Sequence, residues 1–161
     1  MKKYVVLGTF TMLVLVFVSF DSKQTGDAHT TSLNDSLEKD RAKYVAIVLD
    51  KIKGQENLPA DSVFKNIRIF KGIPAKRLLA IMNMGYSNSL GISCGHCHNT
   101  NDFASEENEQ KDIARQMAAM NKEINNNLLK NITGLQGNPA IINCTTCHRG
   151  ELKPALDLAK K

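Results

Sequence analysis

Apolar residues recur along this chain at the three- and four-residue spacing of helices, and they do not alternate with a period of two over any useful length. Residues 39–54 show the helical pattern first and end at Gly54, a frequent helix terminator. The apolar positions that share one face of this predicted helix are Tyr44, Ile47, Val48 and Ile52. The pattern therefore predicts an all-α fold.

Another helix is expected in the middle of the chain. A short apolar run in residues 57–74 ends at Gly72, and Pro74 is suited to begin a helix because proline is favoured at the first helical position. This helix is expected over residues 75–86, followed by a turn over residues 87–93. Its apolar positions are Leu78, Leu79 and Met82, with Met84 as a further candidate.

The longest helix that the pattern predicts lies within residues 104–131. Ser105 is a suitable N-cap, and the glutamates that follow it lie where the helix dipole favours negative charge. One narrow apolar stripe runs along this helix and consists of Ile113, Met117, Met120, Ile124 and Leu128. Residues 132–143 are expected to form a loop.

The first twenty residues have the pattern of an export segment. Lys2 and Lys3 precede a mostly apolar run over residues 4–20, and polar sequence follows. The sequence "FVSFD" lacks the small residues of a cleavage site, and the apolar run is at the short limit for spanning a bilayer. Residues 1–20 are therefore predicted to be a signal peptide or a membrane anchor, and the protein to be periplasmic or held at the inner membrane.

The rest of the chain is predicted to be one small domain with a short tether. Residues 21–38 are mostly small and polar, which predicts a flexible tether, and residues 39–161 form the domain. The sequence contains no tryptophan, three tyrosines and six phenylalanines. The side chains alone therefore supply only a thin core.

The charge pattern does not indicate a nucleic-acid partner. The formal net charge is +5, and two of the lysines lie in the export segment. The other basic residues are scattered along helical faces rather than clustered, which is typical of a solvated surface.

All four cysteines fall in two copies of Cys-x-x-Cys-His, in "SCGHCHNT" at residues 93–100 and "NCTTCHRG" at residues 143–150. This motif is typical of covalent haem c, in which two thiols form thioethers to the porphyrin and the adjoining histidine ligates iron. The sequence therefore predicts two haem c groups. Their thioether residues are Cys94, Cys97, Cys144 and Cys147, and their proximal iron ligands are His98 and His148.

Two other interpretations of the cysteines exist. Four thiolates could close a tetrahedral zinc site, or each pair could act as a redox dithiol. Neither chemistry requires a histidine directly after the second cysteine of both motifs. Bacterial haem c is attached after export, so the export segment also favours haem.

The sixth iron ligand remains to be found among the other histidines and the methionines. His29 lies in the predicted tether, and His96 lies inside the attachment loop on the proximal side of its haem. Thioether sulfur is a known axial ligand, although a methionine stripe can also be simple core packing. The candidates are Met82 or Met84 for one haem and Met117 or Met120 for the other.

Four stretches of the sequence resemble the haem-binding half-repeat of the cytochrome subunit of photosynthetic reaction centres and of its small non-photosynthetic relatives. They are "VFKNIRIFKGIPAKRLLAIM", "SLGISCGHCHN", "DIARQMAAMNKEIN" and "CTTCHRGELKP", and the resemblance covers about residues 60–154. It implies a small multihaem cytochrome whose helices pack around covalent haems, each with a methionine from the preceding helix. On this pattern Met117 is a ligand and Met120 packs, while the other ligand falls near Met82, with Met84 still open.

A haem with two protein ligands on its iron has no position for a substrate, so the expected function is electron transfer without catalytic residues. The expected partners are redox proteins, either a membrane electron-transfer complex or a soluble carrier, with membrane association through residues 4–20. The chain has two motifs where the photosynthetic subunit has four, and it lacks that subunit's lipid-bearing cysteine. The alternative function is a small haem enzyme, a peroxidase or reductase, with one open iron site.

Overall fold

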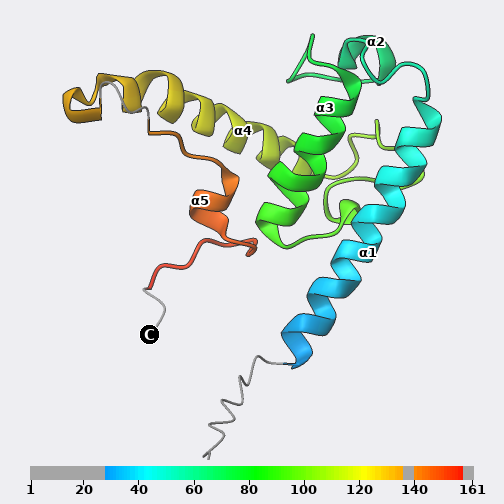
Figure 1. Cartoon of the computed structure of the whole chain (residues 1–161), viewed down its shortest axis with the longest axis horizontal. Helices are drawn as coiled ribbons and strands as arrows, with labels where there is room; N and C mark the ends of the chain where they lie inside the picture. The colour runs from blue at the N-terminus through cyan, green and yellow to red at the C-terminus, as the bar shows by residue number, and fades with distance from the viewer. Residues whose placement is uncertain (1–27, 136–139, 158–161) are drawn as a thin grey trace, which may run out of the picture.

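The computed structural model describes residues 28–135 and 140–157, and within these ranges it is helical with no strand (Figure 1). The α-helices are α1 (Ala28–Lys51), α2 (Ala60–Val63), α3 (Ala75–Ala80), α4 (Gln110–Glu123) and α5 (Cys144–His148). Two π-helical segments, Ile81–Asn88 and Ile124–Leu128, continue α3 and α4. Three short 3-10 turns cover Cys94–His96, Leu129–Asn131 and Thr133–Leu135. The prediction of an all-α fold is confirmed.

The π-helical segment Ile81–Asn88 lies at the centre of the arrangement. It packs against α1 on one side and against α5 on the other, and α1 also contacts the turn Cys94–His96. In Figure 1, α1 and α3 lie side by side, and α4 extends away from them above α5. The two Cys-x-x-Cys-His motifs are therefore brought to one central segment.

The helix predicted over residues 75–86 is confirmed and extends further in π form to Asn88. Pro74 precedes it, and the backbone N–H of Ala75 donates to the carbonyl of Leu58 at 2.9 Å. The N–H of Ala60, at the start of α2, donates to Ile73 at 2.7 Å. These bonds join the starts of two proline-initiated helices.

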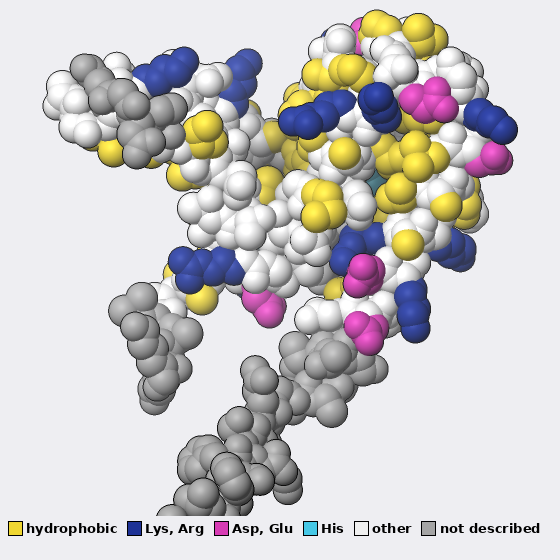
Figure 2. Space-filling view, in the orientation of Figure 1, with side chains coloured by type: hydrophobic (Ala, Val, Ile, Leu, Met, Phe, Trp, Pro, Cys, Tyr) yellow, Lys and Arg dark blue, Asp and Glu magenta, His cyan; other side chains and the backbone are white. Residues whose placement is uncertain are grey.

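The core of the described residues is thin, as the composition predicts. Its only buried apolar side chains are Ile52, Ala60, Ala75 and Leu78, and two of these are alanines. Many larger apolar side chains are exposed. Figure 2 shows them at the surface, both around α1–α3 and along α4, with Lys and Arg dispersed between them.

Two predicted boundaries were wrong. The helix expected to start near Ser105 begins at Gln110. The Glu106 carboxylate forms ion pairs with neighbouring cations, and the Asn108 side chain accepts from the Gln110 N–H at 3.0 Å, so the helix starts later. Its α-helical part is also shorter than α1.

Helix α1 starts at Ala28 and so includes much of the stretch predicted to be a tether, residues 21–38. Extending an existing helix fixes one residue per added hydrogen bond, which offsets the weak helix preference of the small polar residues. Residues 21–27 lie outside the described residues, as do residues 1–20.

A close backbone contact holds the second motif against the turn that precedes the first motif. The Gly150 N–H donates to the Ser89 carbonyl at 2.9 Å, and the hydroxyl groups of Ser89 and Thr145 lie 2.6 Å apart. Gly91 has a φ of 62°, and a Cβ at this position would overlap the Gly150 carbonyl oxygen. Position 91 therefore needs glycine both for its backbone conformation and for space.

We expect Gly91→Ala to lower the free energy of unfolding by about 3 kcal/mol, through backbone strain and the clash with Gly150. Gly54→Ala is the matched control, because Gly54 has a φ of 82° with no atom near the position of the added methyl group. It should lose only about 1 kcal/mol. Urea denaturation of both variants measures the difference, and equal losses would contradict a tight contact at Gly91.

Candidate functional site

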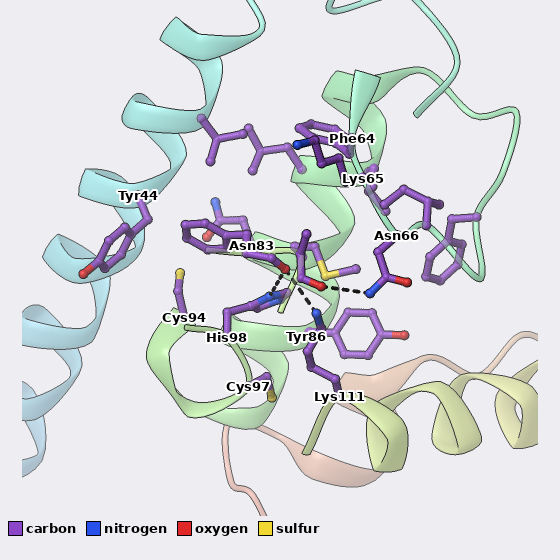
Figure 3. Close-up of a pocket in the computed structure, with 18 of the residues that line it drawn as sticks. Tyr44, Phe64, Lys65, Asn66, Asn83, Tyr86, Cys94, Cys97, His98 and Lys111 are labelled. Atoms are coloured by element: carbon purple, nitrogen blue, oxygen red, sulfur yellow. Dashed lines mark hydrogen bonds between the residues drawn. The ribbon is translucent and has the colours of Figure 1, made fainter. Parts of the chain in front are cut away.

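The first motif lines a cavity of about 650 Å³ in volume. Cys94, Cys97 and His98 line it from the motif, and Met82 lines it from the π-helical segment. Figure 3 shows the labelled motif side chains around this space, with Tyr86 and Lys111 beside them. The volume lies in the range usual for small-molecule and cofactor sites.

The His98 ring is held in one tautomer. Its Nδ1 lies 3.1 Å from the carbonyl oxygen of Phe103, and a carbonyl oxygen can only accept. Nδ1 therefore carries the proton, and Nε2 has a free lone pair for a metal. Burial lowers the pKa of His98, which also favours the neutral ring.

Aromatic packing supports this ring. The centroid of the Phe103 ring lies 5.2 Å from that of His98, and Tyr44 of α1 meets Phe103 edge-on at 5.9 Å. The first histidine is thus held both by a hydrogen bond and by contacts that reach α1.

The two candidate methionines of this half lie in different environments. Met82 lines the cavity together with His98, whereas Met84 does not line it and is 58% exposed. The structure therefore places Met82, and not Met84, beside the first motif.

The second motif repeats the histidine arrangement on an open surface. Asn143 caps α5 in a capping box with Thr146, and Nδ1 of His148 lies 3.1 Å from the carbonyl oxygen of Glu151. The same argument leaves its Nε2 free. Both motifs thus present a histidine with the lone pair that an iron ligand needs.

Helix α4 carries the remaining candidate ligands on an apolar face that the described residues leave uncovered. Met117 is 39% exposed and Met120 is 48% exposed, so exposure does not separate them. Other large apolar side chains exposed on this helix and its continuation are Ile113 and Leu128. A flat apolar group covering this face would bury them.

The surroundings of the cysteines bear on the zinc and dithiol interpretations. Within the part of the chain that the structure describes, no three Cys, His, Asp or Glu side chains gather closely enough to hold a metal ion, and all four thiols are free. Burial raises the pKa of the Cys94, Cys97 and Cys144 thiols. A raised pKa disfavours the thiolate form that a reactive dithiol requires.

Of the two other histidines, only His96 has a described side chain. His96 lies in the attachment loop, and its Nε2 is buried with no hydrogen-bond partner among the described residues. The side chain of His29 lies outside the described residues. His96 does not line the cavity.

Tyr86 lies next to both motifs, which the sequence pattern did not reveal. Burial, followed by the Cys144 and Cys97 thiols, raises its pKa to about 12, and Arg115 opposes this. One side chain of the central π-helical segment therefore faces thiols that are far apart in the sequence.

A charged cluster beside the cavity was also missed. The Glu106 carboxylate accepts from Arg115 at 2.6 Å and pairs with Lys111 at 3.2 Å and Arg68 at 3.4 Å. The Arg115 guanidinium, followed by Lys111, lowers the pKa of Glu106 to about 2. The sequence pattern predicted only that Glu106 lies at a helix start, where the dipole favours negative charge. It did not reveal partners such as Arg68, because they are distant in the chain.

The described helices include none that is both long and apolar enough to cross a membrane. The apolar run over residues 4–20 lies outside the described residues.

Residues 19–159 match the family model of the photosynthetic reaction centre cytochrome c subunit. Cytochrome c-554 of Chloroflexus aurantiacus is 35% identical over 83 residues, which are 52% of this chain and 20% of that protein. The photosynthetic reaction center cytochrome c subunit of Rubrivivax gelatinosus is 40% identical over 81 residues, or 44% of this chain and 22% of that protein. The matched part is about a fifth of the length of each relative.

The Glu106 cluster predicts a pH-dependent contribution to stability. Because the folded state holds this pKa near 2, below the ordinary value of 4.5, the stabilisation is complete above pH 4.5 and is lost as the pH falls towards 2. Glu106→Gln should therefore lower the melting temperature at pH 7, and the difference from wild type should shrink between pH 4.5 and 2.

Glu109→Gln is the control, because Glu109 is exposed and takes part in none of the ion pairs among the described residues. A pH-independent effect of Glu106→Gln, or the same effect from Glu109→Gln, would contradict the assignment.

Proposed function

Because the chain belongs to the family of the photosynthetic reaction centre cytochrome c subunit, we propose that it is an exported dihaem c-type cytochrome that carries electrons between redox partner proteins. The observation that carries the proposal is the position of His98. Its free Nε2 belongs to a ring that lines a cavity of about 650 Å³ together with both cysteines of its motif and Met82. These are the four groups that a covalent haem with two axial ligands requires.

The first site would hold its haem by residues from the first motif and from the π-helical segment Ile81–Asn88. Cys94 and Cys97 form the thioethers, His98 offers Nε2 to the iron, and Met82 offers its sulfur. Membership in a cytochrome c family implies covalently bound haem c with iron, which supplies one-electron exchange. The surrounding apolar side chains would exclude water from the group.

The second site would be made by α5 and α4. Cys144 and Cys147 form the thioethers, His148 offers Nε2, and Met117 offers its sulfur from the uncovered face of α4. The exposed apolar side chains of that face support this proposal, since a haem plate would cover them. Met120 would then contribute packing alone.

The arrangement favours electron transfer over catalysis. A methionine and a histidine at each iron leave no position for a substrate, so the protein's residues would only hold and tune the two groups. The contact of Ser89 with Thr145 and of Gly91 with Gly150 supports a short path between the sites. A peroxidase or reductase would instead need one iron without its methionine.

Location and partners are part of the same proposal. The lysine-initiated apolar segment of residues 1–20 supports export to the periplasm, either as a cleaved signal peptide or as an anchor. The partners would be a membrane electron-transfer complex or a soluble redox carrier, with no role for nucleic acid. A match to a fifth of a photosynthetic subunit does not by itself assign a photosynthetic partner.

The haem count tests the proposal directly. The intact mass of the exported protein, measured after acid-acetone extraction, should exceed the polypeptide mass by two haem units. Replacing Cys144 and Cys147 with alanine should remove one unit and leave the other. Zinc in place of the added mass would disprove the proposal, and a single haem in the wild-type protein would disprove its dihaem part.

Substitution of Met117 tests the sixth ligand of the second haem. Met117→Leu conserves apolarity and volume, so packing should lose only about 1 kcal/mol. The far-red charge-transfer band of thioether-bound ferric haem should fall to about half, one of the two potentials should drop, and carbon monoxide should bind one reduced haem per chain. Met120→Leu is the control and should change none of these.

The first haem allows the same comparison. Met82→Leu should remove the other half of the band, while Met84→Leu should leave it intact, because Met84 is 58% exposed and lies outside the cavity lining. If the Met120 or Met84 variant loses the band instead, the corresponding ligand is assigned to the wrong residue. Carbon monoxide binding to the wild-type protein would favour the enzyme alternative.

A further inference from the structure

The two candidate iron-binding histidines have the same hydrogen bond in different electrostatic surroundings. The carbonyl oxygen of Phe103, which accepts from His98, also accepts from the Lys111 ammonium at 3.1 Å (Figure 3). Lys111 is only 10% exposed and donates as well to the Ser105 carbonyl at 2.6 Å. In the described residues, no cationic side chain donates to the Glu151 carbonyl that accepts from His148.

We propose that Lys111 is a tuning residue that holds the reduction potential of the first haem above that of the second. The inference rests on the proposed function, because it concerns the two haems that the motifs would hold. Lys111 acts through the Phe103 carbonyl and not by touching the iron, so it is a positioning and electrostatic residue.

The acceptor that Lys111 shares with His98 contributes to this effect. A carbonyl oxygen that already accepts from an ammonium group has less electron density to offer a second donor. The Phe103 carbonyl therefore pulls less on the Nδ1 proton of His98, and the ring remains a weaker electron donor at Nε2. A weaker axial donor stabilises the ferric iron less, which raises the potential.

The positive charge around Lys111 acts in the same direction. The cluster around Glu106 contains three cations and one carboxylate, namely Arg68, Lys111, Arg115 and Glu106, so it carries an excess of two positive charges. Lys111 and Arg115 both line the first cavity. Positive charge near the iron disfavours the more positive ferric state, and Glu106 opposes that effect.

The surroundings of the second motif act in the other direction. Cys147 is exposed, and the face of α4 that would cover this haem is open. Solvent stabilises the ferric state, so exposure lowers the potential. In the half-reduced protein, the single electron should therefore reside on the first haem.

The test measures both potentials of the holoprotein by spectroelectrochemical titration. Lys111→Leu should lower the higher potential and leave the lower one in place. We expect the ferric-to-ferrous equilibrium constant of the first haem to fall about tenfold, which is about 59 mV for one electron. Lys122→Leu is the matched control, because this exposed lysine lies on the same helix outside the cavity, and it should shift neither potential.

Two further variants separate tuning from structural damage. Lys111→Arg keeps the charge and the donor, so it should retain most of the higher potential. Glu106→Gln removes the opposing carboxylate and should raise the higher potential, opposite in sign to Lys111→Leu. A general loosening of the site would instead shift the higher potential of Lys111→Leu and of Glu106→Gln in the same direction.

The two potentials are assigned with Met117→Leu, which should lower the potential of the second haem. The inference is overturned if two haems are present but Lys111→Leu leaves the higher potential unchanged or changes the potential of the second haem instead. It is also overturned if Lys111→Leu and Glu106→Gln move the higher potential in the same direction. Absence of haem from the mass spectrum would instead overturn the proposed function, so the two failures are distinguishable.

Discussion

The scarcity of buried apolar side chains is the constraint on which the rest of this structure depends. Among the described residues only Ile52, Ala60, Ala75 and Leu78 are buried and apolar, while methionines, leucines and isoleucines of α4 and its flanks are exposed. Burial of apolar surface is the main favourable term in folding, so such a chain needs another apolar partner. Two covalently bound haems, one in the first cavity and one against α4, would supply this apolar surface.

The same local hydrogen bond orients the histidine of both motifs. In each motif a backbone carbonyl follows shortly after the histidine and accepts from its Nδ1, which leaves Nε2 free. The hydrogen bond is the same, but its surroundings differ. The Phe103 carbonyl also accepts from the mostly buried Lys111 ammonium group, whereas Glu151 is exposed. The two motif histidines therefore have the same hydrogen bond in non-equivalent electrostatic surroundings.

The central π-helical segment couples the halves. It places Met82 beside the first cavity, turns Met84 outwards, and leads through Tyr86 to Ser89, whose hydroxyl and carbonyl contact the second motif. π-helical turns occur often at functional sites because the wider turn re-aims side chains. The glycine contact that follows it, between Gly91 and Gly150, fixes how near the two motifs come.

The sequence by itself determined the helical class and the helix from Ala75, and it predicted haem chemistry for both motifs, because periodicity and Cys-x-x-Cys-His spacing are properties of neighbouring residues. Tertiary structure alone decided which methionine of the π-helical segment lies beside the cavity, where α4 begins, and that Lys111 shares an acceptor with His98. Each of these depends on residues that folding brings together: cations compete for Glu106, for example, and draw it away from the helix start. Which of these contacts forms depends on the distances between side chains in the folded protein, and a local sequence pattern does not encode those distances.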